Sequence, residues 1–289
     1  MSIKEKVYWV WISRIPKVGT KTIQKLLKIY KTPEKIYNLT KQELINCKIQ
    51  KQVIENILDK KYRNNLNEYI NYMEKEKIDI ITIMDKEYPQ KLKQISDFPM
   101  YLYTKGNIKL LNKKSIAMVG SRNCTNYGKN VAKDIGRKLV ENNIVVVSGL
   151  AKGIDTYSHL GALFGNESTI AVLGNSIDSI YPQENKWLAK EILNKNGLII
   201  SEYVMGAELK KINFPARNRI ISGLSDGVLV IEAKEKSGAL LTVDFALEQG
   251  KEVFAIPGNI YSNFSKGTNG IIKEGAKLIS NVDDILQEI

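Results

Sequence analysis

Arginine is rare in this sequence, and its placement suggests contact with phosphate groups. Only six of the 43 basic residues are arginines. Three of them, Arg122, Arg217 and Arg219, lie in two short segments that have the composition of loops or helix starts. A guanidinium group can donate two parallel hydrogen bonds to a phosphate, whereas the ammonium group of lysine is a compact point charge. Arginine retained in a lysine-rich chain therefore indicates a geometric demand such as bidentate phosphate binding.

One of these segments, residues 210–225, combines an aromatic ring with several cations. Phe214 lies between Lys211 and Arg217. Pro215 is typical of the first turn of a helix, which would leave Phe214 just outside that helix. An aromatic ring beside cations is the composition of a reader of single-stranded nucleic acid, because bases stack on the ring and cations follow the backbone. The alternative is that Phe214 packs as a hydrophobic staple, and composition alone does not decide between the two.

A glycine-containing segment after the apolar run 115–119 offers another place for an anion. It begins Gly120-Ser121-Arg122 and reaches Gly128 at the start of a helical pattern. Glycine lets the backbone turn and present N–H groups, and the positive end of the next helix also favours an anion. The segment lacks the second and third glycines of the G-x-G-x-x-G fingerprint, and the chain has no G-x-x-x-x-G-K-[ST] motif. NAD binding and nucleoside-triphosphate hydrolysis are therefore not indicated, and a mere tight turn is the alternative.

A second loop, residues 148–155, again places small residues before a helix. Lys152 could meet a phosphate as a point charge, and Asp155 has the position of a helix N-cap. His159 lies four residues further on the same helical face, with no nucleophile spaced to form a triad with it. We therefore interpret His159 as a packing residue rather than a catalytic one. With this one histidine and two cysteines in the chain, we predict no catalytic residue, no metal site, no disulfide framework and no cofactor.

Short apolar runs separated by helical patterns must position these loops. The runs are residues 115–119, 144–148, 169–173, 197–201, 227–233 and 252–256. Continuous apolar strands alternating with amphipathic helices predict a parallel sheet covered on both faces, in which ligands lie beyond the carboxyl ends of the strands. The predicted fold is α/β, an extended Rossmann-type domain over residues 76–289. Residues 76–112, which contain Pro89 and Pro99, are expected to be an extended connector packed on it.

Residues 1–75 predict a small all-α domain of the SAM or helix-hairpin-helix type. Apolar residues recur at helical spacing, and Thr40 and Glu43 form a capping-box pattern. The segment 15–20 resembles the hairpin of a helix-hairpin-helix DNA-backbone binder, but Lys17 stands where the first glycine is usual. Residues 1–31 carry eight basic side chains and one acidic one. Both a DNA contact and an ordinary helical packing module remain open.

Most of the net positive charge lies in the N-terminal part of the chain. The net charge is +12, of which residues 1–112 carry +10 and residues 113–289 carry +2. A basic balance favours nucleic acid as a partner, although a composition rich in Ile, Lys and Asn explains much of it without function. The N-terminal apolar run is interrupted by Arg14 and is too short for a signal peptide or a membrane span. We expect a cytoplasmic protein with no membrane partner.

Six segments together resemble, in order, the motifs of the DNA-processing protein A family, also called DprA or Smf. They are VGSR (119–122), SGLAKGID (148–155), FPARNRIISGLS (214–225), EAKEKSGALLT (232–242), IPG (256–258) and GTNGII (267–272). The resemblance implies an extended Rossmann fold that binds single-stranded DNA without regard to sequence, protects it as a homodimer and loads the RecA recombinase in natural transformation. Many members also carry a winged-helix-like C-terminal domain, which we expect to be absent from this chain because it ends at Ile289.

The resemblance also assigns DNA-binding residues. Gly120, Ser121 and Arg122 match the family's phosphate-binding loop, and Lys211 and Phe214 match its cationic and base-stacking positions. The family motif also includes Arg217 and Arg219, of which one could brace the fold, and Lys152 is a lesser candidate.

The alternative function is enzymatic. Rossmann proteins of the lysine-decarboxylase-like type, which are similar to this domain, hydrolyse nucleoside monophosphates with a PGGxGTxxE loop. Matching Thr242 to the threonine of that loop places Phe245 at the position of the catalytic glutamate. The general acid or base is then missing, which favours the DNA-binding interpretation over a hydrolase or a small-molecule nucleotide sensor.

Overall fold

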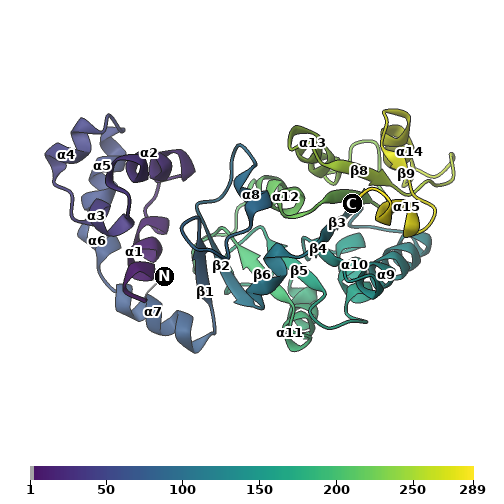
Figure 1. Cartoon of the computed structure of the whole chain (residues 1–289), viewed down its shortest axis with the longest axis horizontal. Helices are drawn as coiled ribbons and strands as arrows, with labels where there is room; N and C mark the ends of the chain where they lie inside the picture. Colours follow the sequence, from purple (N-terminus) through teal and green to yellow (C-terminus); the bar gives the residue numbers. More distant parts are fainter. Residues whose placement is uncertain (1–2) are drawn as a thin grey trace.

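A mixed β-sheet of nine strands forms the centre of the molecule in the computed structural model, which describes residues 3–289 (Figure 1). The strand order is β1-β2-β6-β5-β4-β3-β7-β8-β9. The strands are β1 (Asp79–Thr82), β2 (Tyr101–Gly106), β3 (Ser115–Val119), β4 (Val145–Ser148), β5 (Thr169–Leu173), β6 (Leu198–Ser201), β7 (Gly227–Val230), β8 (Glu252–Ala255) and β9 (Lys277–Leu278). Strands β3 to β9 are parallel to one another, whereas β1 and β2 are antiparallel additions at the edge formed by β6.

Helices cover both faces of this sheet. Those of the sheet domain are α8 (Gln90–Lys93), α9 (Asn126–Glu141), α10 (Ile154–Ala162), α11 (Lys186–Asn194), α12 (Asn213–Leu224), α13 (Leu240–Glu248), α14 (Lys266–Lys273) and α15 (Asp283–Leu286), with 3₁₀ turns η1 (Ile108–Asn112) and η2 (Gln183–Asn185). Ile116 and Met118 of β3 pack with α9 and α10, while Ala117 and Val119 pack with α12 and α13. Both faces are therefore dry, which explains why the central strands read as unbroken apolar runs and confirms the predicted Rossmann-type α/β fold.

The chain reverses its direction of travel across the sheet at β3. From β3 it proceeds through β4, β5 and β6 to one side, and then returns to β7 on the other side of β3. In open α/β sheets such a reversal leaves a crevice beyond the carboxyl ends of the two strands that flank it. The loops after β3 and β7 therefore face a natural ligand site.

Residues 76–112 differ from the extended connector that the sequence suggested, because they supply strands β1 and β2. These strands pair with each other, and β2 pairs with β6, so the sheet is mixed rather than parallel throughout. Ile80, Ile81 and Leu102 are buried there. Pro89 and Pro99 lie between the two strands and so leave the hydrogen-bond ladders intact. The domain boundary at residues 75 and 76 stays a prediction.

The N-terminal helices form a module at one end of the molecule, on the left of Figure 1. They are α1 (Ile3–Ser13), α2 (Thr20–Tyr30), α3 (Pro33–Tyr37), α4 (Lys41–Asn46), α5 (Lys51–Leu58), α6 (Lys60–Arg63) and α7 (Leu66–Lys75). The capping box is confirmed, since Thr40 and Glu43 exchange side-chain and backbone hydrogen bonds. Trp9 and Trp11 belong to a core that continues to Tyr103 of β2. The N-terminal module and the sheet share this core, so they pack directly against each other and are not joined by a linker alone.

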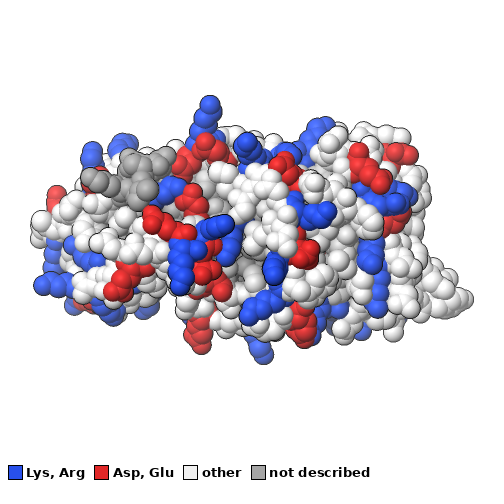
Figure 2. All heavy atoms as spheres, turned by 90° about the horizontal axis from the view of Figure 1, so that it is seen from below, with Lys and Arg blue, Asp and Glu red and all other residues white. Residues whose placement is uncertain are grey.

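None of the helices within residues 3–289 is both long and apolar enough to cross a lipid bilayer. On the face in Figure 2, basic and acidic side chains are intermixed. The net charge therefore does not by itself single out that face as a nucleic-acid surface, and a site must be sought in local geometry.

Candidate functional site

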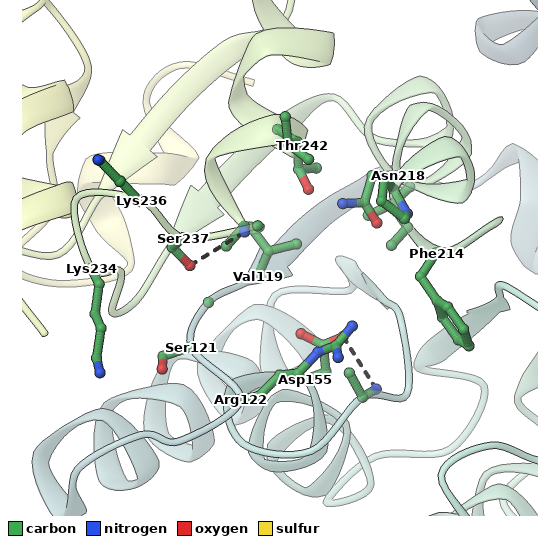
Figure 3. Close-up of a pocket in the computed structure, with 17 residues that line it drawn as sticks. Val119, Ser121, Arg122, Asp155, Phe214, Asn218, Lys234, Lys236, Ser237 and Thr242 are labelled. Atoms are coloured by element: carbon green, nitrogen blue, oxygen red, sulfur yellow. Dashed lines mark hydrogen bonds between the residues drawn. The ribbon is translucent and has the colours of Figure 1, made fainter. Parts of the chain in front are cut away.

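A cleft of about 450 Å³ lies at the carboxyl ends of β3 and β7, where the fold leads us to expect a ligand. A smaller pocket of about 60 Å³ adjoins it, and the two share Arg122, Ala151 and Phe214. In Figure 3, Arg122 lies on one wall, Phe214 at one end, and Lys234 and Lys236 toward the opposite end. The arrangement is a continuous groove with an aromatic end and a cationic end.

Backbone hydrogen bonds to neighbouring segments fix the loop after β3 at Ser121. The amide of Ser121 donates to the carbonyl of Glu232 at 2.7 Å, and its own carbonyl accepts from the amide of Ile154 at 3.1 Å. Gly153, with φ of +78°, passes so close that a Cβ there would lie 2.2 Å from the Ser121 oxygen. Gly120 and Ser121 therefore shape the turn, and Arg122 contributes the exposed side chain of this loop to the lining of the cleft.

The positive end of α9 already has an anion, which is the protein's own Glu232. Its buried carboxylate accepts hydrogen bonds from the amide of Thr125 at 2.9 Å and from the Thr125 hydroxyl at 2.5 Å. Gly128 leaves room for it, since a Cβ at that position would lie 2.3 Å from a Glu232 oxygen. The external phosphate that the sequence suggested at this helix start is thus replaced by an internal carboxylate.

Arg217 lies in the interior, in contrast to the DNA contact suggested by the sequence. It is 4% exposed, and its guanidinium donates to the carbonyl oxygens of Gly149 at 2.8 Å and of Val172. Its Nε donates to Asn218 at 3.2 Å. In this structure Arg217 clamps the ends of β4 and β5 to α12, and its guanidinium is not offered to a ligand.

Arg219 is also buried and internally paired. Its guanidinium binds both carboxylate oxygens of Glu202 at 2.8 Å and one oxygen of Asp97 at 3.2 Å. These partners follow β6 and precede β2, so Arg219 ties α12 to the edge of the sheet. Both helix arginines thus support the groove from outside it.

Burial sets the protonation of the groups behind the cleft. Burial raises the pKa of Asp155, and the positive charge of Arg217 opposes that rise. The Asp155 carboxylate accepts from the amides of Gly149 at 3.2 Å and Ala151 at 3.3 Å, so it holds the loop that precedes α10, and its position in the first turn also places a negative charge at the start of that helix. Burial also lowers the pKa of Arg217 to about 10, which leaves it charged at neutral pH. Asp155 and Arg217 therefore form a buried, mutually compensating pair of charges.

His159 lies outside both pockets and has the surroundings of a packing residue. It is fully buried, its Nδ1 lies 2.7 Å from the hydroxyl of Thr169, and its Nε2 has no partner among the described residues. Burial lowers the pKa of His159 to about 3. The imidazole is therefore neutral in the folded protein at pH 7.

This burial predicts a loss of stability in mild acid. The unfolded chain binds a proton at His159 below its ordinary pKa of about 6.5, whereas the folded chain binds it only near 3. Stability therefore declines as the pH falls between these values, and from pH 6.5 to pH 5 the decrease should be about 2 kcal/mol. Urea unfolding at both pH values measures it. The variant His159→Gln should lose less, and parallel decreases in the two proteins would contradict a buried neutral histidine.

The remaining predicted residues lie around the aromatic end of the groove. Phe214 packs on Gly174 and lies 5.4 Å from the ring centroid of Tyr181 at an interplanar angle of 48°. Lys152 lines the smaller pocket and forms an exposed ion pair with Glu184. Lys211 is exposed just before α12 but lines neither pocket. The structure thus brings Arg122, Phe214 and Lys152 together in the smaller pocket. Lys211 lies two residues before the start of α12, outside both pockets.

Several groove residues were not assigned to the site from the sequence, although all but Tyr181 lie in the family segments 214–225 and 232–242. They are Tyr181, Asn218, Lys234, Lys236, Ser237 and Thr242. Tyr181 follows an apolar strand in the same way as Arg122 does, so an aromatic residue in a strand-end loop was the available signal. Among the described residues no group of three or more His, Cys, Asp and Glu side chains is arranged to hold a metal ion.

Comparison with known proteins places these features in a family. A sequence model of the DNA recombination-mediator protein A family matches residues 79–289. The DNA processing protein DprA of Streptococcus pneumoniae is 47% identical over 214 residues, which cover 74% of this chain and 75% of that protein.

Two solved structures are similar as well. The X-ray structure of DNA processing protein A from Streptococcus pneumoniae aligns with a TM-score of 0.81 and 36% identity, covering 100% of this chain and 99% of that one. A structure of DNA processing protein A from Helicobacter pylori, described by its single-stranded DNA binding mode, aligns with a TM-score of 0.65 and 33% identity. That alignment covers 73% of this chain and 94% of the other.

Proposed function

The chain belongs to the DNA recombination-mediator protein A family, and from this premise we propose that its groove binds single-stranded DNA without regard to sequence. The observation that carries the proposal is that one continuous groove contains both Arg122 and Phe214. A cation holds the phosphate backbone, and an exposed ring face accepts an unstacked base. Neither contact depends on which base is present.

The paired rings explain a preference for single strands. Phe214 and Tyr181 lie in contact at the mouth of the smaller pocket, where a base of a duplex could not reach without leaving its own stack. A relative from Helicobacter pylori, 33% identical, is described as binding single-stranded DNA. This likeness supports the same substrate class here.

Replacing Arg122 by Ala should weaken binding to a dT oligonucleotide and flatten its salt dependence. For single strands, the slope of log affinity against log salt changes by about 0.7 for each phosphate that the protein no longer neutralises. Fluorescence anisotropy at several salt concentrations measures both quantities. Arg137→Ala, which removes a half-exposed arginine on α9, is the matched control and should bind like the parent. If the slope of log affinity against log salt were unchanged in Arg122→Ala, Arg122 would not contact a DNA phosphate.

We also propose that the protein protects the bound strand and hands it to the RecA recombinase in natural transformation. The support is the description of the family as a recombination mediator.

Homodimerisation and a cytoplasmic location belong to the same proposal. Exposed apolar side chains at Leu247, Ile260 and Tyr261 offer a surface for a second copy, and sedimentation velocity would measure the association.

A hydrolase remains the alternative, and it can be tested directly. Asp155 is the carboxylate that lines the larger pocket, and two backbone amides and Arg217 already engage it. This engagement favours a structural role. Release of nucleobase from nucleoside monophosphates by the parent, but not by Asp155→Asn, would favour the enzyme instead.

A further inference from the structure

Four helices begin around the groove, and only two of them have an internal carboxylate. Glu232 accepts a hydrogen bond from the N-cap residue of α9, and Asp155 is an acidic residue in the first turn of α10. By contrast, α12 and α13 have neither an acidic residue in the first turn nor a side-chain cap. The positive ends of these two helices therefore face the groove without a partner of opposite charge.

The start of α13 contains a buried hydroxyl that bonds to nothing within residues 3–289. Thr242 is 1% exposed, and its Oγ1 has no hydrogen-bond partner among the described residues. The residue lines the larger pocket, and Figure 3 shows its oxygen directed from the wall into the cavity. Buried polar groups in folded proteins are nearly always paired. Among the described side-chain atoms that are buried without a partner, the Thr242 oxygen is the one that belongs to a residue lining the cleft, so a ligand in the cleft could supply its partner.

Further donors line the groove between Thr242 and the lysine end. The amides of Gly238 and Leu241 have no partner among the described residues, and the space beside Gly238 is open. The exposed side chains of Lys234 and Lys236 lie at the same end of the groove. Amide, hydroxyl and ammonium groups can all donate hydrogen bonds, and Asp155, the carboxylate that lines the same cleft, is already engaged by the amides of Gly149 and Ala151. Such a set fits a phosphate.

We infer that the start of α13 is a second phosphate subsite, formed by Thr242, the amides of Gly238 and Leu241, and Lys236. Its ligand is an internal phosphodiester of the same strand that lies on Phe214 and Arg122, so the inference rests on the proposed function. In Figure 3 the two lysines and Phe214 lie at opposite ends of the groove. The strand therefore runs from the aromatic end past Arg122 to α13.

A pair of substitutions at Thr242 tests the hydroxyl. Thr242→Val keeps the shape and removes the donor, whereas Thr242→Ser keeps the donor. With a dT oligonucleotide that has no terminal phosphate, we expect about tenfold weaker binding for Thr242→Val, because hydrogen bonds to charged groups are the stronger ones. Thr242→Ser should bind like the parent. Thermal unfolding should show that both variants are folded, since the hydroxyl has no internal partner to lose.

The lysine provides a second, independent readout. Lys236→Gln should flatten the salt dependence by about 0.7 in slope, while Lys190→Gln on α11, which lines neither pocket, should not. Parent-like binding by Thr242→Val together with an unchanged slope for Lys236→Gln overturns the subsite. If Arg122→Ala still binds weakly in that case, the proposed function stands; if Arg122→Ala also binds like the parent, the proposed function fails too. If Thr242→Val weakened the binding of thymidine 5′-monophosphate but not that of the oligonucleotide, the ligand of this subsite would be a free nucleotide. The assignment of the subsite to a DNA strand would then be overturned.

Discussion

Arg217→Met is expected to lower the free energy of unfolding by about 3–5 kcal/mol, the cost of removing one member of a buried pair of charges. The guanidinium donates to the carbonyl oxygens of Gly149 and Val172 and compensates the charge of Asp155. Methionine fills a similar volume but removes both hydrogen bonds to the carbonyl groups and leaves the Asp155 carboxylate without the positive charge of Arg217. Urea unfolding measures the change.

The matched control for this prediction is Arg137→Met on α9. Its side chain is 43% exposed and pairs with Asp134 and Glu141 at the surface, so its removal should cost less than about 1 kcal/mol. An unchanged urea midpoint for Arg217→Met combined with weaker DNA binding would mean that Arg217 contacts DNA, as the sequence motif suggested. That result would also contradict the role of Arg217 in holding α12 to the ends of β4 and β5.

Phe214→Ala should cost about 1–3 kcal/mol of binding free energy for single-stranded DNA, the range for stacking of a base on an aromatic side chain. The salt slope should stay close to that of the parent, because no charge is removed. Phe214→Leu retains most of the apolar packing on Gly174 and should lose nearly as much affinity. Anisotropy titrations with a dT oligonucleotide, run alongside thermal unfolding, separate the loss of stacking from a loss of folding.

Phe164→Ala is the control for Phe214→Ala. Phe164 is 72% exposed after the end of α10 and lines neither pocket, so its removal should leave DNA binding unchanged. Should Phe214→Ala bind DNA as the parent does, the ring would be only a packing residue. The hydrophobic staple suggested as an alternative would then be the better interpretation.

The sequence was informative where local pattern and tertiary environment agree. The runs that form β3 to β8 are apolar at successive positions because both faces of the sheet are covered, and the runs predict the fold for that reason. Arg122 and Phe214 meet in one groove because the ends of parallel strands and the start of α12 converge there. The sequence analysis placed Arg122 after a strand and Phe214 just before a helix, and the family resemblance assigned both to one DNA site. The structure differs in that Phe214 lies within the first turn of α12.

Other features depend on contacts that spacing cannot show. Arg217 and Arg219 have the composition of a DNA contact, but the packing of α12 against the sheet turns both inward. Glu232 lies more than 100 residues from Thr125, so its occupation of the start of α9 requires the fold. Thr242 lies in the family segment 232–242, but the sequence does not show that its hydroxyl is buried in the cleft wall without a partner among the described residues. Strands β1 and β2 join the sheet by antiparallel pairing, which the parallel pattern further along the chain does not reveal.

Photocrosslinking tests the central claim most directly, because it reports where the strand lies. A dT oligonucleotide irradiated in complex with the full chain, followed by mass spectrometry of the crosslinked peptides, maps the contacts. We predict crosslinks at Phe214 and Tyr181, which disappear when an excess of unlabelled dT is added. Crosslinks confined to the helices of residues 3–75 or to the loop of residues 257–264, with none at the groove, would contradict it.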